Sequence, residues 1–365
     1  MTKSVMLLVG TKKGLFTMRS SDRRKWSTEE PYGAPAPVHH ASFDPRDQSM
    51  YAAINSTWGG SRIEYSRDLG KTWSVGANPK FPEGSDRSFY QTWHIEPSHA
   101  STPNVVWAGV EPAALFMSED RGETWKLNRA LDDQPSRKEW VPGFGGMGLH
   151  SIAIDAADAR FMQVGISVGG VYTSHDGGAS WERDNRQTGG PGGASFERTG
   201  PDDRRPDVFG CIHKLLAHPK VGGVRFMRVH EEVYWREPGE TTWTFRTPGL
   251  PSNFGFAAAI HPHDRSTAWC IPLDGRIRTA ETPGIAVYKT ADKGASWTRH
   301  DQGLPQGAPL ESLREGMHND RFDDVGVYFG TANGDVYASL DEGRSWDRIA
   351  QYLPYVTSVH AATIE

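Results

Sequence analysis

Histidine is the residue with the most chemical potential in this sequence of 365 residues, which contains 14 histidines. Several of them stand at the starts of short segments that alternate like β-strands. His39, His150 and His213 fall at the same position relative to the turn that follows each segment, and His94 lies three places later. Several imidazoles around one cavity are a usual ligand set for zinc, manganese, nickel or copper. We therefore predict that His94, His150 and His213 hold a divalent transition metal.

Further polar and aromatic residues are expected at the same strand starts and in the loops after the second strand of each unit. The candidate catalytic residues are His39, His40, Glu111, His230, Arg314 and Glu315. The candidate substrate-binding residues are Trp58, Gln91, Trp93, Lys214, Phe256 and His318. Arg314 would hold an anionic substrate group, and Glu111 and Glu315 are the best carboxyl pair for a glycosidase. Because adjacent strand residues point in opposite directions, the sequence leaves open whether His39 or His40 faces the centre.

The elements that must position these residues come from an internal repeat. The pattern Ser/Thr-x-Asp-x-Gly-x-Ser/Thr-Trp occurs five times, at 66–73, 118–125, 174–181, 290–297 and 339–346. Two degenerate copies, at 20–26 and 237–243, complete the series. Asp68, Asp120 and Asp176 are separated by 52 and 56 residues. A period of this size indicates a propeller or a solenoid.

Each copy of this box follows two strand-like segments and precedes a short strand that opens with the Trp. The predicted fold is therefore all-β, a seven-bladed β-propeller of four-stranded antiparallel blades, with about 52 residues per blade. The sequence begins at the second strand of a blade, so the C-terminal strand should join the N-terminal blade and close the ring. The whole chain, 1–365, is then a single domain with blades at about 1–30 plus 355–364, 37–76, 91–128, 147–184, 211–246, 254–300 and 313–349.

The five boxes resemble the Asp-box, or bacterial neuraminidase (BNR) repeat, of sialidase-like propellers. The resemblance covers the whole chain and implies the propeller fold. Proteins with this repeat include sialidases, xyloglucan hydrolases, sorting receptors and photosystem assembly factors. The segment 39–45, His-His-Ala-Ser-Phe-Asp-Pro, looks like a bacterial group often described as glycosyl hydrolase or exo-sialidase. True sialidases have six blades and a Phe/Tyr-Arg-Ile-Pro element near the start, whereas this sequence predicts seven blades and lacks that element.

The two faces of the predicted propeller should differ. The boxes join the third and fourth strands, and their polar groups are expected to bond the turn itself. The long loops, at about 76–90, 128–146, 184–210 and 273–284, all fall on the opposite face. Loops on a rigid scaffold commonly carry the functional site. We therefore expect the pocket on the loop face, with 184–210 as a lid.

Composition excludes several classes of function. The 40 Lys and Arg residues against 45 Asp and Glu residues give a net charge of −5, which does not indicate nucleic-acid binding. No apolar run approaches the length of a spanning helix, and the first apolar stretch is too short for a signal peptide. The two cysteines, Cys211 and Cys270, do not make a disulfide framework. We expect a cytoplasmic protein with a small-molecule substrate, no nucleotide cofactor, and no membrane or nucleic-acid partner.

Three functions fit these observations. The favoured one is a metal-assisted hydrolase or lyase that acts on a small polar or carboxylated, sugar-like substrate. The second is a metal-free, sialidase-like glycosidase, which needs two carboxyl groups at a defined separation. The third is a binding or scaffold propeller without catalytic activity.

Overall fold

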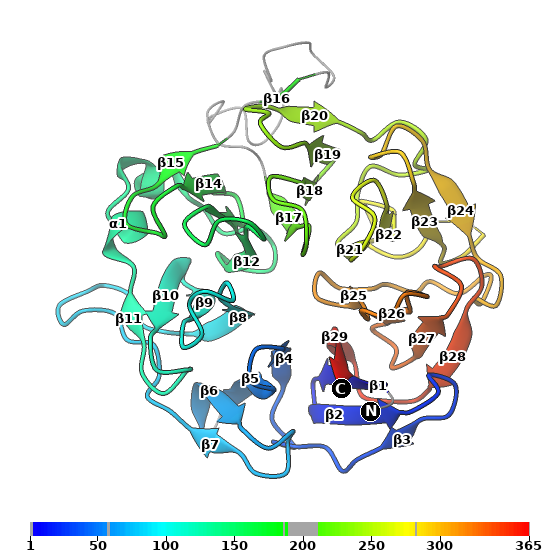
Figure 1. Ribbon diagram of the computed structural model, residues 1–365, viewed down its shortest axis with the longest axis horizontal. Coiled ribbons are helices and arrows are strands. Elements are labelled where there is room, and N and C mark those ends of the chain that lie inside the picture. Colours follow the sequence, from blue (N-terminus) through cyan, green and yellow to red (C-terminus); the bar gives the residue numbers. More distant parts are fainter. Residues whose placement is uncertain (1–2, 57–58, 185–186, 189–210, 282, 365) are drawn as a thin grey trace.

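The structure is a computed structural model that describes residues 3–56, 59–184, 187–188, 211–281 and 283–364. Seven sheets of mainly antiparallel strands stand around a common axis, like the blades of a propeller (Figure 1). The predicted all-β, seven-bladed fold is therefore confirmed. Alternating apolar residues bounded by glycine turns favour these short strands over helices.

In the first four blades, the strands follow one another from the axis outward. Blade 1 consists of β29 (Val356–Ile364), β1 (Ser4–Thr11), β2 (Gly14–Ser20) and β3 (Ser27–Thr28). Blade 2 consists of β4 (Val38–Asp44), β5 (Ser49–Ser56), β6 (Gly60–Ser66) and β7 (Ser74–Val75). Blade 3 consists of β8 (Gln91–Pro97), β9 (Val106–Glu111), β10 (Ala114–Ser118) and β11 (Lys126–Leu127). Blade 4 consists of β12 (Leu149–Ile154), β13 (Met162–Ile166), β14 (Gly170–Ser174) and β15 (Glu182–Arg183).

The remaining three blades follow the same order. Blade 5 consists of β17 (Ile212–Ala217), β18 (Arg225–Val229), β19 (Val233–Arg236) and β20 (Trp243–Phe245), with β16 (Gln187–Thr188) outside them. Blade 6 consists of β21 (Ala258–Ile260), β22 (Ala268–Cys270), β23 (Val287–Thr290) and β24 (Thr298–His300). Blade 7 consists of β25 (Met317–Asn319), β26 (Val327–Gly330), β27 (Val336–Ser339) and β28 (Asp347–Ala350).

Two features depart from the simple four-stranded plan. In blade 5, β16 pairs in parallel with β20, with Gln187 opposite Trp243, so this sheet has five strands. In the loop between blades 3 and 4, the chain forms a short α-helix, α1 (Arg129–Asp132), and a 3-10 turn, η1 (Pro135–Glu139). Asn128 caps α1 because its side chain accepts a hydrogen bond from the Leu131 amide.

The ring closes through the two ends of the chain. Strand β29 pairs antiparallel with β1, with Leu7 opposite Ala361, and the two termini lie in the same blade (Figure 1). The predicted closure by the C-terminal strand is therefore observed. It removes the exposed inner edge that β1 would otherwise present to solvent.

The boxes are turns whose polar groups bond to one another. In box 118–125, Ser118 Oγ donates to Asp120 Oδ1 at 2.7 Å, and the Gly122 amide donates to Ser118 Oγ at 2.7 Å. Asp120 also accepts from the Thr124 amide at 2.8 Å and from its hydroxyl at 2.5 Å. Gly122 has φ of +92°, a conformation that favours glycine. The box carboxylates are thus occupied by the turn, as the sequence predicts.

The core consists of the contacts between neighbouring blades. Among the described residues, seven clusters of buried apolar side chains are found, and each joins two adjacent blades. Leu7 and Tyr328 in one cluster, for example, join blades 1 and 7. In the part of the chain that the structure describes, no helix is long and apolar enough to cross a membrane. The blades therefore form a rigid ring that positions the residues around the axis.

Candidate functional site

A β-bulge at the same level of five inner strands sets the geometry around the axis. The residue that the strand pairing skips is Thr357 in β29, His39 in β4, Trp93 in β8, His150 in β12 and His213 in β17. A bulge leaves one extra residue unpaired and re-aims the side chains beside it. His39 and His40 consequently enter two different cavities along the axis. This answers the question that the sequence left open.

The bulges also correct the predicted alignment of His94. Trp93 occupies the bulge position of His39, and His94 is equivalent to His40. His94 therefore lies one place beyond the matched position and not three. The turn was a poor reference point because the connection after β8 spans 98–105, whereas the one after β4 spans only 45–48.

Two cavities occupy the centre of the ring. The loop-face cavity, about 790 Å³, is lined by His39, Trp93, Phe144, Cys211, His213, His230, Glu231, Phe256, Arg278, Glu311, Arg314 and Tyr355, among others. The box-face cavity, about 420 Å³, is lined by His40, His94, Glu96, Lys214, His318, Arg321 and His360, together with the turns after the inner strands. Glu315 lines both cavities. The histidines expected at one mouth are therefore divided between the two.

Arg314 lies in the loop-face cavity between two aromatic rings. Its guanidinium carbon is 5.4 Å from the centre of the Trp93 ring and 5.5 Å from that of Phe256. Arg314 Nε donates to the His213 carbonyl oxygen at 2.6 Å, which fixes the side chain. No carboxylate of the described residues forms an ion pair with Arg314. Such a guanidinium is suited to hold a carboxylate of a ligand.

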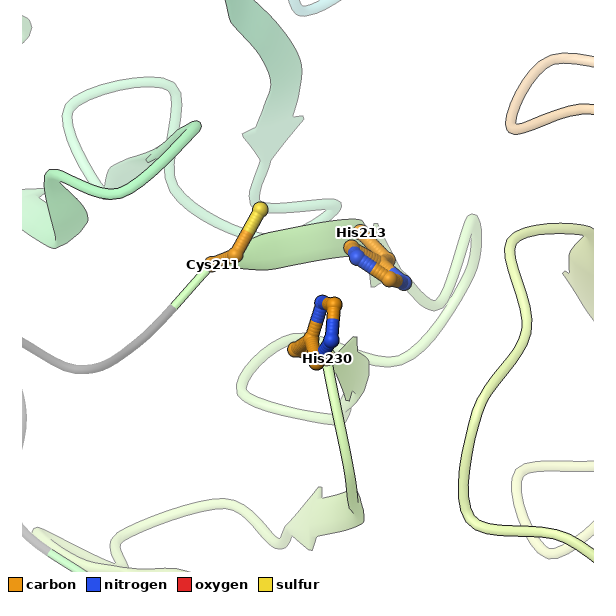
Figure 2. Close-up of side chains that lie close together, drawn as sticks. All are labelled: Cys211, His213 and His230. Atoms are coloured by element: carbon orange, nitrogen blue, oxygen red, sulfur yellow. The ribbon is translucent and has the colours of Figure 1, made fainter. Parts of the chain in front are cut away.

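Blade 5 supplies a thiol and two imidazoles to the same cavity. Cys211 and His213 come from the start of β17, and His230 follows β18 (Figure 2). One ligand atom from each of the three lies within 4.8 Å of the other two. His213 Nδ1 is 2.8 Å from the Gly255 carbonyl oxygen, so this nitrogen must carry the proton and Nε2 keeps its lone pair. Burial and the nearby Arg314 charge lower the pKa of His213 well below its usual value.

A second group of titratable residues surrounds Glu315. Lys214 Nζ donates to Glu315 Oε2 at 2.6 Å, and His40 Nε2 lies 3.6 Å from the same oxygen. His94 Nδ1 lies 3.4 Å from Glu315 Oε1. Burial opposes ionisation of Glu315, but Lys214 and His94 hold its pKa well below the usual value. Glu315 is therefore a buried carboxylate that joins blade 7 to blades 2, 3 and 5.

The hydrogen bonds of this second group make it unsuited to bind a metal. His40 Nδ1 accepts from the Ile95 amide at 3.2 Å, so its proton lies on Nε2, the nitrogen that faces Glu315. His94 has Glu96 at 3.1 Å from its other nitrogen, so both ring nitrogens face carboxylates. Burial opposes protonation, but Glu315 and Glu96 raise the pKa of His94 to about 9. Metal ligation requires a nitrogen lone pair that neither ring offers at neutral pH.

The other predicted site residues occupy varied places. Glu111 accepts from Gln91 Nε2 at 2.7 Å and from Trp93 Nε1 at 2.9 Å, so its carboxylate fixes the cavity wall. His150 is fully buried beside Trp93, with ring centres 6.5 Å apart, and takes no part in either cluster of ligand atoms. His318 stacks on His360 with ring centres 4.2 Å apart in the box-face cavity. Trp58 and the proposed lid lie outside the described residues, apart from Asp184 and 187–188.

Several residues of the loop-face cavity were not predicted from the sequence. These are Phe144, Cys211, Arg278, Glu311 and Tyr355. Cys211 had a detectable signal, because it stands two residues before His213 and side chains two apart on a strand share a face. Phe144 and Arg278 had none, since they come from loops of different blades, and they meet with the guanidinium 4.8 Å from the ring centre.

The sequence is similar to known proteins that are much longer, and the similarity covers only part of their length. No family model matches the sequence. A probable oligoxyloglucan-reducing end-specific xyloglucanase of Neosartorya fischeri is 24% identical over 291 residues, which cover 70% of this chain and 33% of that protein. The oligoxyloglucan-reducing end-specific xyloglucanase of Emericella nidulans is 28% identical over 300 residues, covering 73% and 35%. This chain therefore spans about a third of the length of these curated relatives.

Solved structures resemble the fold over nearly the whole chain. A GH74 xyloglucanase from Xanthomonas campestris has a TM-score of 0.63 at 16% identity, covering 98% of this chain and 52% of that chain. AztD from Citrobacter koseri has a TM-score of 0.57 at 10% identity, covering 99% and 98%. YCF48 from Cyanidioschyzon merolae has a TM-score of 0.55 at 17% identity, covering 88% of each chain. At these identities, the likeness concerns the propeller fold alone.

Proposed function

We propose that this chain is a carbohydrate-cleaving enzyme that binds a carboxylated oligosaccharide in the loop-face cavity. The observation that carries the proposal is Arg314, held between the faces of Trp93 and Phe256 without a carboxylate partner among the described residues. A guanidinium forms strong bidentate hydrogen bonds with a carboxylate. Trp93 and Phe256 line the same cavity and add apolar surface beside the guanidinium, which suits the apolar part of a sugar.

The size and lining of the cavity support a ligand of this class. Its volume of about 790 Å³ lies within the usual range of small-molecule sites. At its rim, the Phe144 ring is 95% exposed and packs against Arg278, so a second aromatic–cation pair faces an incoming ligand. The cavity thus combines apolar faces with positive charge, as a carboxylated sugar requires.

The candidates for acid–base work are the carboxylates in and beside this cavity. Lys214 and two histidines surround Glu315, and Gln91 and Trp93 bond to Glu111. Glu231 and Glu311 also line the cavity, and Glu311 accepts from the Tyr355 hydroxyl at 2.6 Å. We assign the pair that a glycosidase needs to Glu231 and Glu311.

The sequence relatives support carbohydrate as the substrate class. The two relatives described above are named as xyloglucanases, and their similarity covers 70% and 73% of this chain. The proposed substrate differs from xyloglucan in one respect, because Arg314 and Arg278 favour a substrate with a negative charge. Metal-assisted cleavage remains a second candidate, favoured by the lone pair on His213 Nε2.

The test is cleavage of two substrate sets, oligosaccharides that contain uronic acids and xyloglucan oligosaccharides, measured by the appearance of new reducing ends. We expect cleavage of the carboxylated set. Arg314→Gln should lower kcat/KM for it by about 10- to 100-fold, the cost of one charge-assisted hydrogen bond. Arg344→Gln, on the exposed box face, is the control and should leave the rate unchanged. No new reducing ends from either set would contradict the proposal and favour a binding scaffold.

A further inference from the structure

We propose that Cys211, His213 and His230 form a zinc site in the wall of the loop-face cavity, with one coordination position open to the cavity. Sulfur and imidazole nitrogen are the ligand types that zinc prefers. This set shares only His213 with the metal ligands expected from the sequence. The proposal rests on the donor atoms of blade 5 and does not depend on the proposed carbohydrate activity.

The register of blade 5 brings the three side chains together. Ile212 of β17 pairs with Val229 of β18 at the end of the two strands. Cys211 precedes Ile212 and His230 follows Val229, so both lie just beyond this last pair. Ile212 is fully buried in the core between blades 4 and 5, whereas Cys211 and His213, on either side of it, line the loop-face cavity. The bulge at His213 lets this residue leave the regular pairing. Figure 2 shows the three side chains close together at the ends of these two strands.

The separations are close to those of a bound metal. The three ligand atoms lie within 4.8 Å of one another. Tetrahedral zinc with bonds of about 2.0 to 2.3 Å places its ligand atoms about 3.3 to 3.6 Å apart. Zinc binding would therefore draw these ligand atoms closer by at most about 1.5 Å, while the 2.8 Å contact with the Gly255 carbonyl holds His213.

The surroundings of His213 fit a ligand better than those of His40 or His94, the two histidines of the other cluster. A metal-bound imidazole commonly donates its second N–H to a carbonyl oxygen, as His213 Nδ1 does to Gly255. The rings of His40 and His94 have the opposite arrangement, with N–H groups facing Glu315. On binding, the Cys211 thiol would form a sulfur–zinc bond and release its proton to solvent.

Three protein ligands also imply a particular kind of site. Structural zinc is almost always held by four protein ligands, whereas catalytic zinc has three and keeps an open position. The three donors of blade 5 line the loop-face cavity, and Glu231 follows His230 directly. A bound zinc would therefore present its open position to whatever occupies the cavity.

The experiment is titration of the full chain, stripped of metal with a chelator, with ZnCl₂ in a calorimeter. We expect one equivalent of zinc to bind. Cys211→Ser and His230→Ala should each weaken binding at least about 100-fold, the upper end of the loss seen for outer-shell partners of a metal. The matched controls are Cys270→Ser, at the other, buried cysteine, and His94→Gln, at the other cluster, and both should bind zinc like the wild type.

Cobalt provides a readout that identifies the thiolate. Co²⁺ bound at this site should show a thiolate-to-cobalt charge-transfer band that Cys211→Ser removes. Thermal unfolding of the metal-free variants verifies that each one folds. The proposal is overturned if the band is absent, or if both ligand variants bind zinc as tightly as the wild type. Because no saccharide is used, these outcomes are independent of whether the chain cleaves carbohydrate.

Discussion

At the scale of single residues, backbone hydrogen bonds decide what each central histidine can do. His213 Nδ1 lies against a carbonyl oxygen and leaves a lone pair on Nε2, whereas His40 Nδ1 accepts from an amide and presents N–H instead. His94 lies between two carboxylates, which overcome the effect of burial and raise its pKa to about 9, so both ring nitrogens carry protons at neutral pH. The sequence identified these histidines as central, but it could not show which backbone group each ring meets, because those groups come from neighbouring blades.

The pH dependence of stability should report the charge on His94. Its pKa is raised from 6.5 to about 9 by Glu315 and Glu96, which lie on either side of the ring, while His40 packs against it. The folded state favours protonated His94, so the contribution of this residue to stability is complete when the pH is below 6.5, the pKa in the unfolded chain. The contribution is lost as the pH rises through about 9, the pKa in the folded protein. Urea unfolding of the wild type should therefore show a loss of up to about 3 kcal/mol between about pH 6 and pH 10.

The control for this prediction is His94→Gln, which keeps a polar side chain without an ionisable ring. Its free energy of unfolding should change much less over the same pH range. An equal loss in both proteins would show that another group is responsible.

The protein should lose stability when Glu315 loses its negative charge. Glu315→Gln leaves Lys214, which is 5% exposed, without an anionic partner. Breaking a buried pair in this way costs about 3 to 5 kcal/mol, so urea unfolding should show a loss of that size. Glu29→Gln removes the partner of Arg19 at the surface and should cost less than about 1 kcal/mol. Similar losses for the two variants would contradict the assignment of Glu315 as the central anion.

At the scale of elements, the bulges of the inner strands build the site. The repeat pattern predicts the strands and the box turns because alternation and glycine positions are local signals. The bulges are not visible in the same way, since one extra residue changes neither the hydrophobic pattern nor the box. This is why the sequence matched His39 with His150 and His213 but missed the other two members, Trp93 and Thr357.

A substitution at Gly148 tests whether Trp93 is a binding wall of the loop-face cavity. A Cβ at this position would lie 2.4 Å from Trp93 Nε1, so Gly148→Ala should push the indole away from Arg314. We expect at least about a tenfold loss of affinity for a carboxylated oligosaccharide, measured by calorimetry. Gly143→Ala is the matched control in the same loop, because its Cβ would meet no atom closer than 3.7 Å. Equal affinities of the two variants would exclude Trp93 as a binding wall.

At the scale of the whole molecule, closure of the ring and the central ion cluster hold the blades together. Glu315 lies in blade 7, whereas Lys214, His40 and His94 lie in blades 5, 2 and 3. The blade number and the closure were predictable, because the repeat length and the unpaired first strand both follow from the sequence. The division of the centre into two cavities was not, because a sequence does not show how far along the axis a side chain points.

Removal of the last strand should destroy this ring. A chain that ends at residue 354 lacks β29, so β1 loses its inner partner and presents an open edge. We expect aggregation in size-exclusion chromatography and no cooperative thermal unfolding. A monomeric truncated chain that melts at the wild-type temperature would show that closure contributes little to stability.

The most direct test of ligand recognition is calorimetric titration with a uronic acid and with the neutral sugar that differs from it by a hydroxymethyl in place of the carboxylate. We predict that the wild type prefers the acid by at least about tenfold, through the charged bond to Arg314. In Arg314→Gln, this preference should nearly disappear. Equal affinity of the wild type for the two sugars, or a preference that survives in Arg314→Gln, would contradict the proposal that the loop-face cavity recognises a carboxylated saccharide.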